Sequence, residues 1–107
     1  MPADGAGEAR RFYVHVLGMA EIAKPHGLEA TGSIWFASGG VELHLGIDPN
    51  FKPATKAHPA FRCRDYDTLI DRLRKAEVEV KTDGRIPGVR RCHISDPFGN
   101  RIELIAE

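Results

Sequence analysis

The sequence is poor in cysteine, in aromatic residues and in long apolar runs, and it has no excess charge of either sign. Its 107 residues include two cysteines and no Cys-x-x-Cys pair, too few for a disulfide-dense scaffold. Fifteen Lys and Arg balance fifteen Asp and Glu, so the basic surplus typical of nucleic-acid binding is missing. No apolar run approaches the length of a membrane span, and the first residues lack a signal-peptide pattern. We therefore expect one soluble, cytoplasmic domain over residues 1–107 that binds neither nucleic acid nor membrane.

Two helices are predicted from apolar residues that recur at helical spacing. The first begins at a candidate N-cap, Asp4, and ends at Gly18, and its apolar face is formed by Ala9, Phe12, Tyr13, Val16 and Leu17. The second begins after Asp65 or Asp67, and its apolar face is formed by Tyr66, Leu69, Ile70 and Leu73.

Seven short segments have the composition and flanking turns of strands. They are Met19–Ala23, Ser33–Ala37, Val41–Ile47, His58–Arg64, Val78–Lys81, Val89–Ser95 and Arg101–Ala106. The order helix, strand, strand, strand occurs twice, and the two copies end in VEL and IEL. We therefore predict an α+β fold of two βαβββ modules, residues 1–50 and 56–107. The strand that opens the second module, at His58, has no counterpart in the first module within residues 1–107.

Two glutamates lie in otherwise apolar strands near the ends of the two copies. Alternation places Glu42 and His44 on the face opposite Val41 and Leu43, and Glu103 interrupts the last strand in the same way. Such a carboxylate needs water, a cation or a donor. Two interpretations stay open: each glutamate lies on a solvated sheet face, or Glu42, Glu103 and His58 form a ligand set for a divalent metal such as Zn²⁺, Ni²⁺ or Fe²⁺.

Four segments, RRFYVHVLGM, WFASGGVELHL, HPAF and DPFGNRIELI, resemble the vicinal oxygen chelate superfamily, which includes glyoxalase I, bleomycin-resistance proteins and extradiol dioxygenases. The resemblance covers the chain from about Glu8 to Glu107. It implies paired βαβββ modules that form a partial barrel around a metal or ligand cavity. It also implies that Glu42, His58 and Glu103 are metal ligands, while the family's fourth ligand matches no residue here. At Glu77, after the second helix, the family usually has a glycine.

The resemblance implies two functions. The first is a metal-dependent enzyme, of lyase or isomerase type, in which a divalent ion (Zn, Ni, Fe or Mn) chelates two neighbouring substrate oxygens and Glu42 or Glu103 carries a proton. An extradiol-type dioxygenase is a variant of this reading, with His44 or an absent residue completing two histidines and one carboxylate. The second is a protein that binds a drug or another small molecule without metal. The three retained ligands favour the enzyme, and the unmatched fourth ligand favours the binder.

Other side chains are expected to touch the small-molecule ligand or to pair subunits. Trp35, His44, Arg91 and His93 are candidate substrate-binding residues, and arginine suits an anionic substrate. An unpaired strand edge in the first module is a template for another chain, so a homodimer is expected with Trp35 or Phe36 near the interface. The alternative is a monomer in which residues Met1–Gly7 fold back across that edge.

Overall fold

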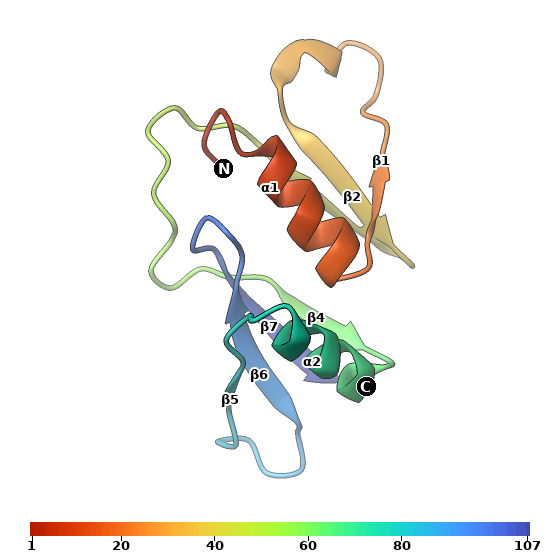
Figure 1. The fold of residues 1–107 in the computed structure, drawn as a ribbon, viewed down its shortest axis with the longest axis vertical. Helices are drawn as coiled ribbons and strands as arrows, with labels where there is room; N and C mark the ends of the chain where they lie inside the picture. Colours follow the sequence, from red (N-terminus) through yellow and green to blue (C-terminus); the bar gives the residue numbers. More distant parts are fainter. The chain divides into compact units, whose positions relative to one another are not determined.

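The structure is a computed structural model that describes residues 1–107 as two compact units, Met1–Lys52 and Pro53–Glu107. Each unit has a helix beside one sheet (Figure 1). No helix in either unit has the length and apolar character that a membrane span requires.

The first unit is a three-stranded antiparallel sheet with one helix. Helix α1 (Ala6–Arg10) continues as a π-helical segment (Arg11–Val16), and a short 3₁₀ turn (Glu29–Thr31) precedes the second strand. The strands β1 (Ala20–Ile22), β2 (Ile34–Ser38) and β3 (Val41–Leu45) form a sheet in that order. Tyr13 stacks on Phe36 with ring centroids 5.1 Å apart, which joins the helix to the sheet.

The second unit is a four-stranded mixed sheet in the order β4-β7-β6-β5. Its elements are β4 (Ala60–Cys63), α2 (Tyr66–Lys75), β5 (Lys81–Thr82), β6 (Arg91–Ser95) and β7 (Arg101–Ala106). Strands β4 and β7 are parallel, and the other neighbours are antiparallel. Helix α2 buries Ile70 and Leu73, and the sheet buries alternate residues of β6 and β7.

The predicted α+β fold, with seven strands and two main helices, is confirmed, and the corrections concern element ends. The first helix has Gly5, not Asp4, at its N-cap. The strand predicted at Val78–Lys81 is shorter and later, Lys81–Thr82, because only these residues pair with β6. The strand predicted from Val89 starts at Arg91, because the Val89 backbone N–H donates to Ile86 in a turn. Asp65 is the N-cap of α2, without a side-chain capping bond.

Met1 forms a short parallel pairing beyond the end of β3. Its amino group donates to the backbone oxygen of Gly46 at 2.8 Å, and the Asp48 N–H donates to the Met1 oxygen at 3.0 Å. The second unit has the same kind of bond where Glu107 donates to Cys63, the last residue of β4, at 3.1 Å. The sheet of the first unit has no strand equivalent to β4, so β3 is the edge strand there.

Both helices end at a residue in the left-handed conformation. Gly18 has φ 81°, and Glu77 has φ 62°, the only positive φ of a residue other than glycine. A Cβ atom makes this conformation unfavourable by about 1–2 kcal/mol. The two helix ends therefore have the same backbone requirement, which glycine meets without strain and glutamate meets under strain.

Replacing Glu77 by glycine is expected to stabilise the protein. Relief of the left-handed strain outweighs the greater backbone entropy that glycine gives the unfolded chain, so the free energy of unfolding should rise by about 0.5–1 kcal/mol. Urea unfolding measures this change. Gly18→Ala is the matched control and should lower stability by about 1 kcal/mol; a Glu77→Gly variant no more stable than the parent would contradict the argument.

Candidate metal centre

Glu103 lies in the middle of β7, between the two strands that carry its neighbours. It pairs across the sheet with His93 of β6 on one side and with Ala60 of β4 on the other. Its backbone N–H donates to Pro59 at 2.9 Å, which brings the start of β4 alongside. This register places His58, two residues before β4, close to the Glu103 side chain.

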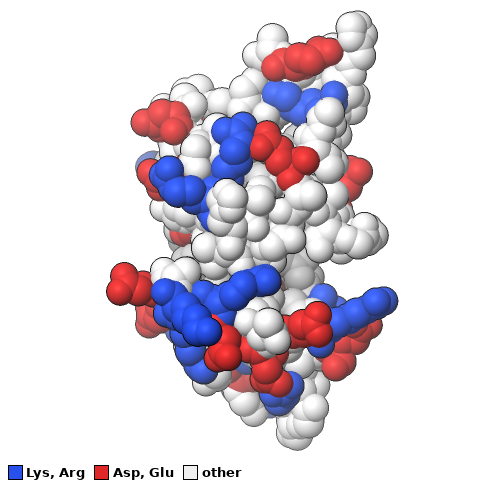
Figure 2. All heavy atoms as spheres, turned by 45° about the vertical axis from the view of Figure 1, so that its right-hand side comes forward, with Lys and Arg blue, Asp and Glu red and all other residues white.

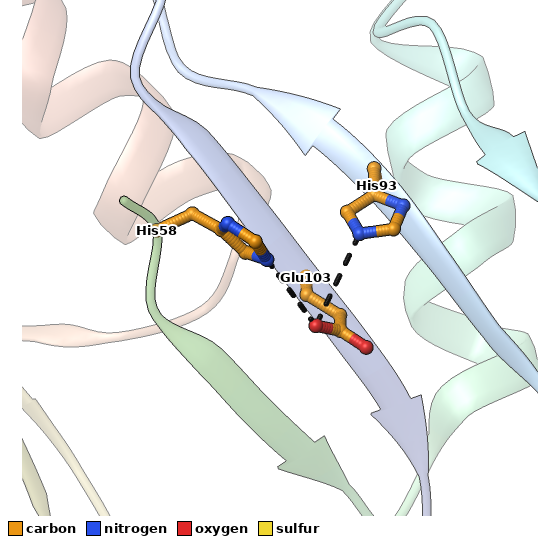
Figure 3. Close-up of side chains that lie close together, drawn as sticks. All are labelled: His58, His93 and Glu103. Atoms are coloured by element: carbon orange, nitrogen blue, oxygen red, sulfur yellow. Dashed lines mark hydrogen bonds and ion pairs between the residues drawn. The ribbon is translucent and has the colours of Figure 1, made fainter. Parts of the chain in front are cut away.

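Two imidazoles converge on one oxygen of Glu103. His58 Nε2 lies 3.3 Å from Oε2, and His93 Nε2 lies 4.0 Å from the same atom. Figure 3 shows the two rings directed toward the carboxylate from either side. All three side chains are half-buried, and their candidate ligand atoms lie within 4.8 Å of one another.

The His58 ring is held by a backbone oxygen on its far side. His58 Nδ1 lies 2.7 Å from the Lys56 oxygen, and because a carbonyl oxygen only accepts, this contact is a hydrogen bond in the tautomer with the proton on Nδ1. In the neutral ring Nε2 then has a lone pair that is directed at an oxygen of the Glu103 carboxylate. Two electron-rich atoms face each other there, and a cation between them would be bound by both. Metal-binding histidines are oriented in this way by a carbonyl on the other nitrogen. Arg101 Nη2 also donates to the Lys56 oxygen, at 2.8 Å. It lies 3.1 Å from His58 Nδ1, which is not a hydrogen bond in this tautomer because both nitrogens are then donors.

The other oxygen of Glu103 is occupied by an arginine. Arg91 Nη1 donates to Oε1 at 2.6 Å, and Arg91 Nη2 donates to Asp83 at 2.9 Å. The Arg91 hydrogen bond holds the pKa of the Glu103 carboxyl below its usual value, and burial lowers the pKa of the His93 ring. Glu103 is therefore ionised and His93 neutral at pH 7, as metal binding requires of both.

The three side chains fit a divalent metal ion. Ligand atoms bound at about 2.1 Å and at tetrahedral angles lie about 3.4 Å apart. The distance between His58 Nε2 and Glu103 Oε2, 3.3 Å, is close to this value, and the His93 ring must move toward the other two ligand atoms to reach it. Two imidazoles and one carboxylate suit zinc, nickel and iron, and leave positions open for a substrate.

The other predicted metal ligand, Glu42, lies on β3 in the first unit. Its side chain is 58% exposed and pairs with His44 at 3.1 Å. His44 in turn stacks on Trp35, with ring centroids 3.4 Å apart and ring planes at 7°. The roles of Glu42, as ligand and as proton carrier, and of Trp35 and His44 in substrate binding stay predictions.

Strand pairing aligns Glu103 with His44 instead of Glu42. Trp35 pairs with Ile22 and His44 as His93 pairs with Lys81 and Glu103, and Ile22 and Lys81 each lie four residues after the end of a helix, at Gly18 and Glu77. From Gly18 to His44 is 26 residues, and from Glu77 to Glu103 is also 26. The VEL and IEL motifs are thus offset by two positions in the structures of the two units, and the stacked pair in the first unit stands where the second unit has a histidine and a carboxylate.

Sequence reasoning assigned His93 to the substrate and did not single out Asp83. The structure groups His93 with His58 and Glu103. The sequence shows that His93 and Arg91 lie on the same face of a strand, because they are two residues apart. It does not show the cross-strand register that places His93 opposite Glu103. Arg91, the arginine predicted to bind substrate, lies at this cluster, and so does Arg101, whereas Arg90 pairs with Asp67.

Glu103→Gln is expected to lower the free energy of unfolding at pH 7 by about 2 kcal/mol, because it leaves the Arg91 guanidinium, 11% exposed, without its charged partner. Urea unfolding checks this. Because the folded-state pKa of Glu103 is depressed, the stabilisation is present above the usual glutamate pKa of about 4.3 and is lost as the pH falls through the lower, folded-state value.

The matched control is Glu21→Gln. Glu21 also pairs with an arginine, Arg10, at 2.6 Å, but both side chains are at least 40% exposed, so the cost should stay below about 1 kcal/mol. Equal losses in the two variants would contradict a special role for the Glu103 ion pair.

Comparison with known proteins places these features in one family. The family model described as Glyoxalase/Bleomycin resistance protein/Dioxygenase superfamily matches residues 1–104. No curated protein matches the sequence. A putative glyoxalase family protein from Bacillus anthracis is 44% identical, with a TM-score of 0.95, over 100% of this chain and 88% of that one.

Two further solved structures are similar at lower identity. TnmS3, an antibiotic binding protein from Streptomyces, is 27% identical, with a TM-score of 0.73 over 99% of this chain and 89% of its own. Lactoylglutathione lyase from Agrobacterium tumefaciens is 25% identical, with a TM-score of 0.72 over 99% and 88% of the two chains. With a family model that spans nearly every residue, the chain belongs to the glyoxalase/bleomycin resistance protein/dioxygenase superfamily.

Proposed function

We propose that this protein is a metal-dependent enzyme, of lyase or isomerase type, that acts on a small substrate through two neighbouring oxygens. The observation that carries the proposal is the convergence of His58 and His93 on one oxygen of Glu103, with the far side of His58 fixed by a backbone carbonyl. A divalent ion held there would act as a Lewis acid on the two substrate oxygens.

The charges around the cluster favour a substrate with a negatively charged oxygen. Asp83 and Glu103 are offset by Arg85 and Arg91, and Arg101 adds one positive charge beside His58. The imidazoles are ligands in their neutral form, so the cluster has no spare negative charge to balance a divalent ion. An ionised hydroxyl, enediolate or carboxylate of the substrate would supply it.

Glu42 is the better proposed proton carrier of the two glutamates. The hydrogen bond from Arg91 keeps the pKa of Glu103 low, which makes Glu103 a weak base. Glu42 pairs with His44 and with no arginine or lysine. Its alternative role, as a further metal ligand, is separated by experiment below.

Metal binding tests the proposal. Purified protein is expected to contain about one divalent ion per chain, and His58→Gln, His93→Gln and Glu103→Gln should each weaken Zn²⁺ binding at least about tenfold, measured by competition with a chromogenic chelator. His26→Gln is the control, because His26 is fully exposed and pairs only with Glu29. Wild-type protein that binds none of Zn²⁺, Ni²⁺, Mn²⁺ or Fe²⁺ would refute the enzyme proposal.

The variant Glu42→Gln decides between the two proposed roles of Glu42. If the variant loses metal affinity, Glu42 is a ligand; if it keeps the metal but loses turnover, Glu42 is the proton carrier. Lactoylglutathione is the first compound to assay, given the similarity to a lactoylglutathione lyase. Turnover of a catechol with O₂, and with Fe²⁺ as the only active metal ion, would instead favour the dioxygenase variant, which two histidines and one carboxylate suit.

A metal-free binding protein is the second candidate, and the Arg91 ion pair favours it. That pair satisfies Glu103 without a metal, and the similar TnmS3 is an antibiotic binding protein. The stacked rings of Trp35 and His44 would then present a flat surface to a planar ligand. Tight binding of an aromatic ligand by metal-free protein would support this candidate.

We also propose that the protein forms a homodimer through the edge of the first sheet. Strand β3 is an edge strand, and its Val41 side chain is 43% exposed. Phe36 is fully buried, so Trp35 is the aromatic residue available near an interface. Light scattering at micromolar concentration should give twice the single-chain mass of 11.8 kDa; a mass near 11.8 kDa would exclude the dimer.

A further inference from the structure

Asp83 is a largely buried carboxylate beside the cluster that does not belong to the proposed ligand set. Arg85, an exposed arginine, donates to both of its oxygens. It follows β5, and its backbone N–H donates to the Arg91 oxygen at 3.0 Å, which fixes it opposite β6. Its side chain is 10% exposed. Burying an ionised carboxylate to this extent is costly unless charged hydrogen-bond donors contact it.

One of its partners is the arginine that clamps Glu103. Asp83 Oδ2 accepts from Arg91 Nη2 at 2.9 Å, while Arg91 Nη1 donates to Glu103 at 2.6 Å. The guanidinium therefore bridges two carboxylates through its two terminal nitrogens. Its planar geometry fixes which oxygen of Glu103 it occupies, and this leaves Oε2 facing the two imidazoles.

The same oxygen of Asp83 faces the His93 ring. His93 Nδ1 lies 3.9 Å from Asp83 Oδ2, and His93 Nε2 lies 4.0 Å from Glu103 Oε2. Both distances are longer than a hydrogen bond, so the ring must move slightly to donate, and a neutral imidazole with one N–H can donate to only one of these two carboxylates. Donation to Asp83 leaves the Nε2 lone pair directed at the centre of the cluster, where a metal ligand must have it.

We propose that Asp83 is a positioning residue of the candidate metal centre: it holds Arg91 against Glu103 and keeps the proton of His93 on Nδ1. His58 obtains the same orientation from the Lys56 carbonyl, so the two imidazoles are prepared by different groups. This inference rests on the proposed metal-dependent function.

The first measurement is the affinity for Zn²⁺ alone. Asp83→Asn should weaken it at least about tenfold, because the neutral amide loses the charge that anchors Arg91 and attracts the His93 proton. Asp67→Asn is the matched control. Asp67 also binds an arginine through two hydrogen bonds, at 2.8 and 3.0 Å, but it lies outside the cluster. The Zn²⁺ affinity of this variant should therefore stay within about twofold of wild type. Asp83→Glu, which keeps the charge, should recover most of the lost affinity.

The second measurement needs no metal. Long-range ¹H–¹⁵N spectra of metal-free protein, at about pH 8.5 where histidines are neutral, report the tautomer of each ring. Asp83→Asn should move His93 toward the Nε2–H form, because Glu103 is then the only charged acceptor near the ring. His58 should stay in the Nδ1–H form in the same spectrum, and His93→Gln assigns the signal.

The outcomes separate the two proposals. Wild-type protein that binds no metal refutes the enzyme proposal, and the tautomer of His93 still decides the role of Asp83. An unchanged His93 tautomer, or Zn²⁺ affinity of Asp83→Asn within about twofold of wild type, overturns the positioning role. Should Asp83→Asn not fold, as judged by urea unfolding, Asp83→Ser is the neutral variant to measure.

Discussion

The second unit depends on how it accommodates one anion, the carboxylate of Glu103 in the middle of a central strand. Ile102 and Leu104 beside it are buried, so the strand cannot move Glu103 into water without exposing its core. Burying an ionised carboxylate is costly unless charged donors surround it. Arg91 meets one oxygen at 2.6 Å, and the two imidazoles face the other, so the site chemistry follows from the way the sheet solves this problem.

The surrounding charges have the same origin. Arg91 needs its own second partner, which Asp83 supplies, and Asp83 in turn binds the exposed Arg85. Elsewhere, positive and negative side chains lie next to each other on the face drawn in Figure 2, in keeping with a net charge of zero. The network at Glu103 differs from those surface pairs in being largely shielded from water, where charge interactions are stronger.

The two units use one backbone plan for different chemistry. Helix ends at Gly18 and Glu77 and the cross-strand pairs of β2 with β3 and of β6 with β7 are equivalent. At the equivalent pair the second unit has His93 and Glu103, and the first has Trp35 and His44 in a face-to-face stack. In this chain the three side chains that could hold a metal ion therefore lie in one unit, and the first unit has the stacked rings with Glu42 beside them.

The sequence by itself determined the α+β class, the two copies and the apolar faces of both helices, because these depend on local periodicity and on residues close in the chain. It also identified His58 and Glu103, because a histidine before a strand and a carboxylate within an apolar strand are visible as exceptions to a pattern. Only the tertiary structure decided that His93 joins them, that Asp83 holds Arg91, and that His44, not Glu42, is the positional equivalent of Glu103. These facts depend on strand register, where a shift of one residue turns a side chain to the other face, and register is set by pairing between segments far apart in the sequence.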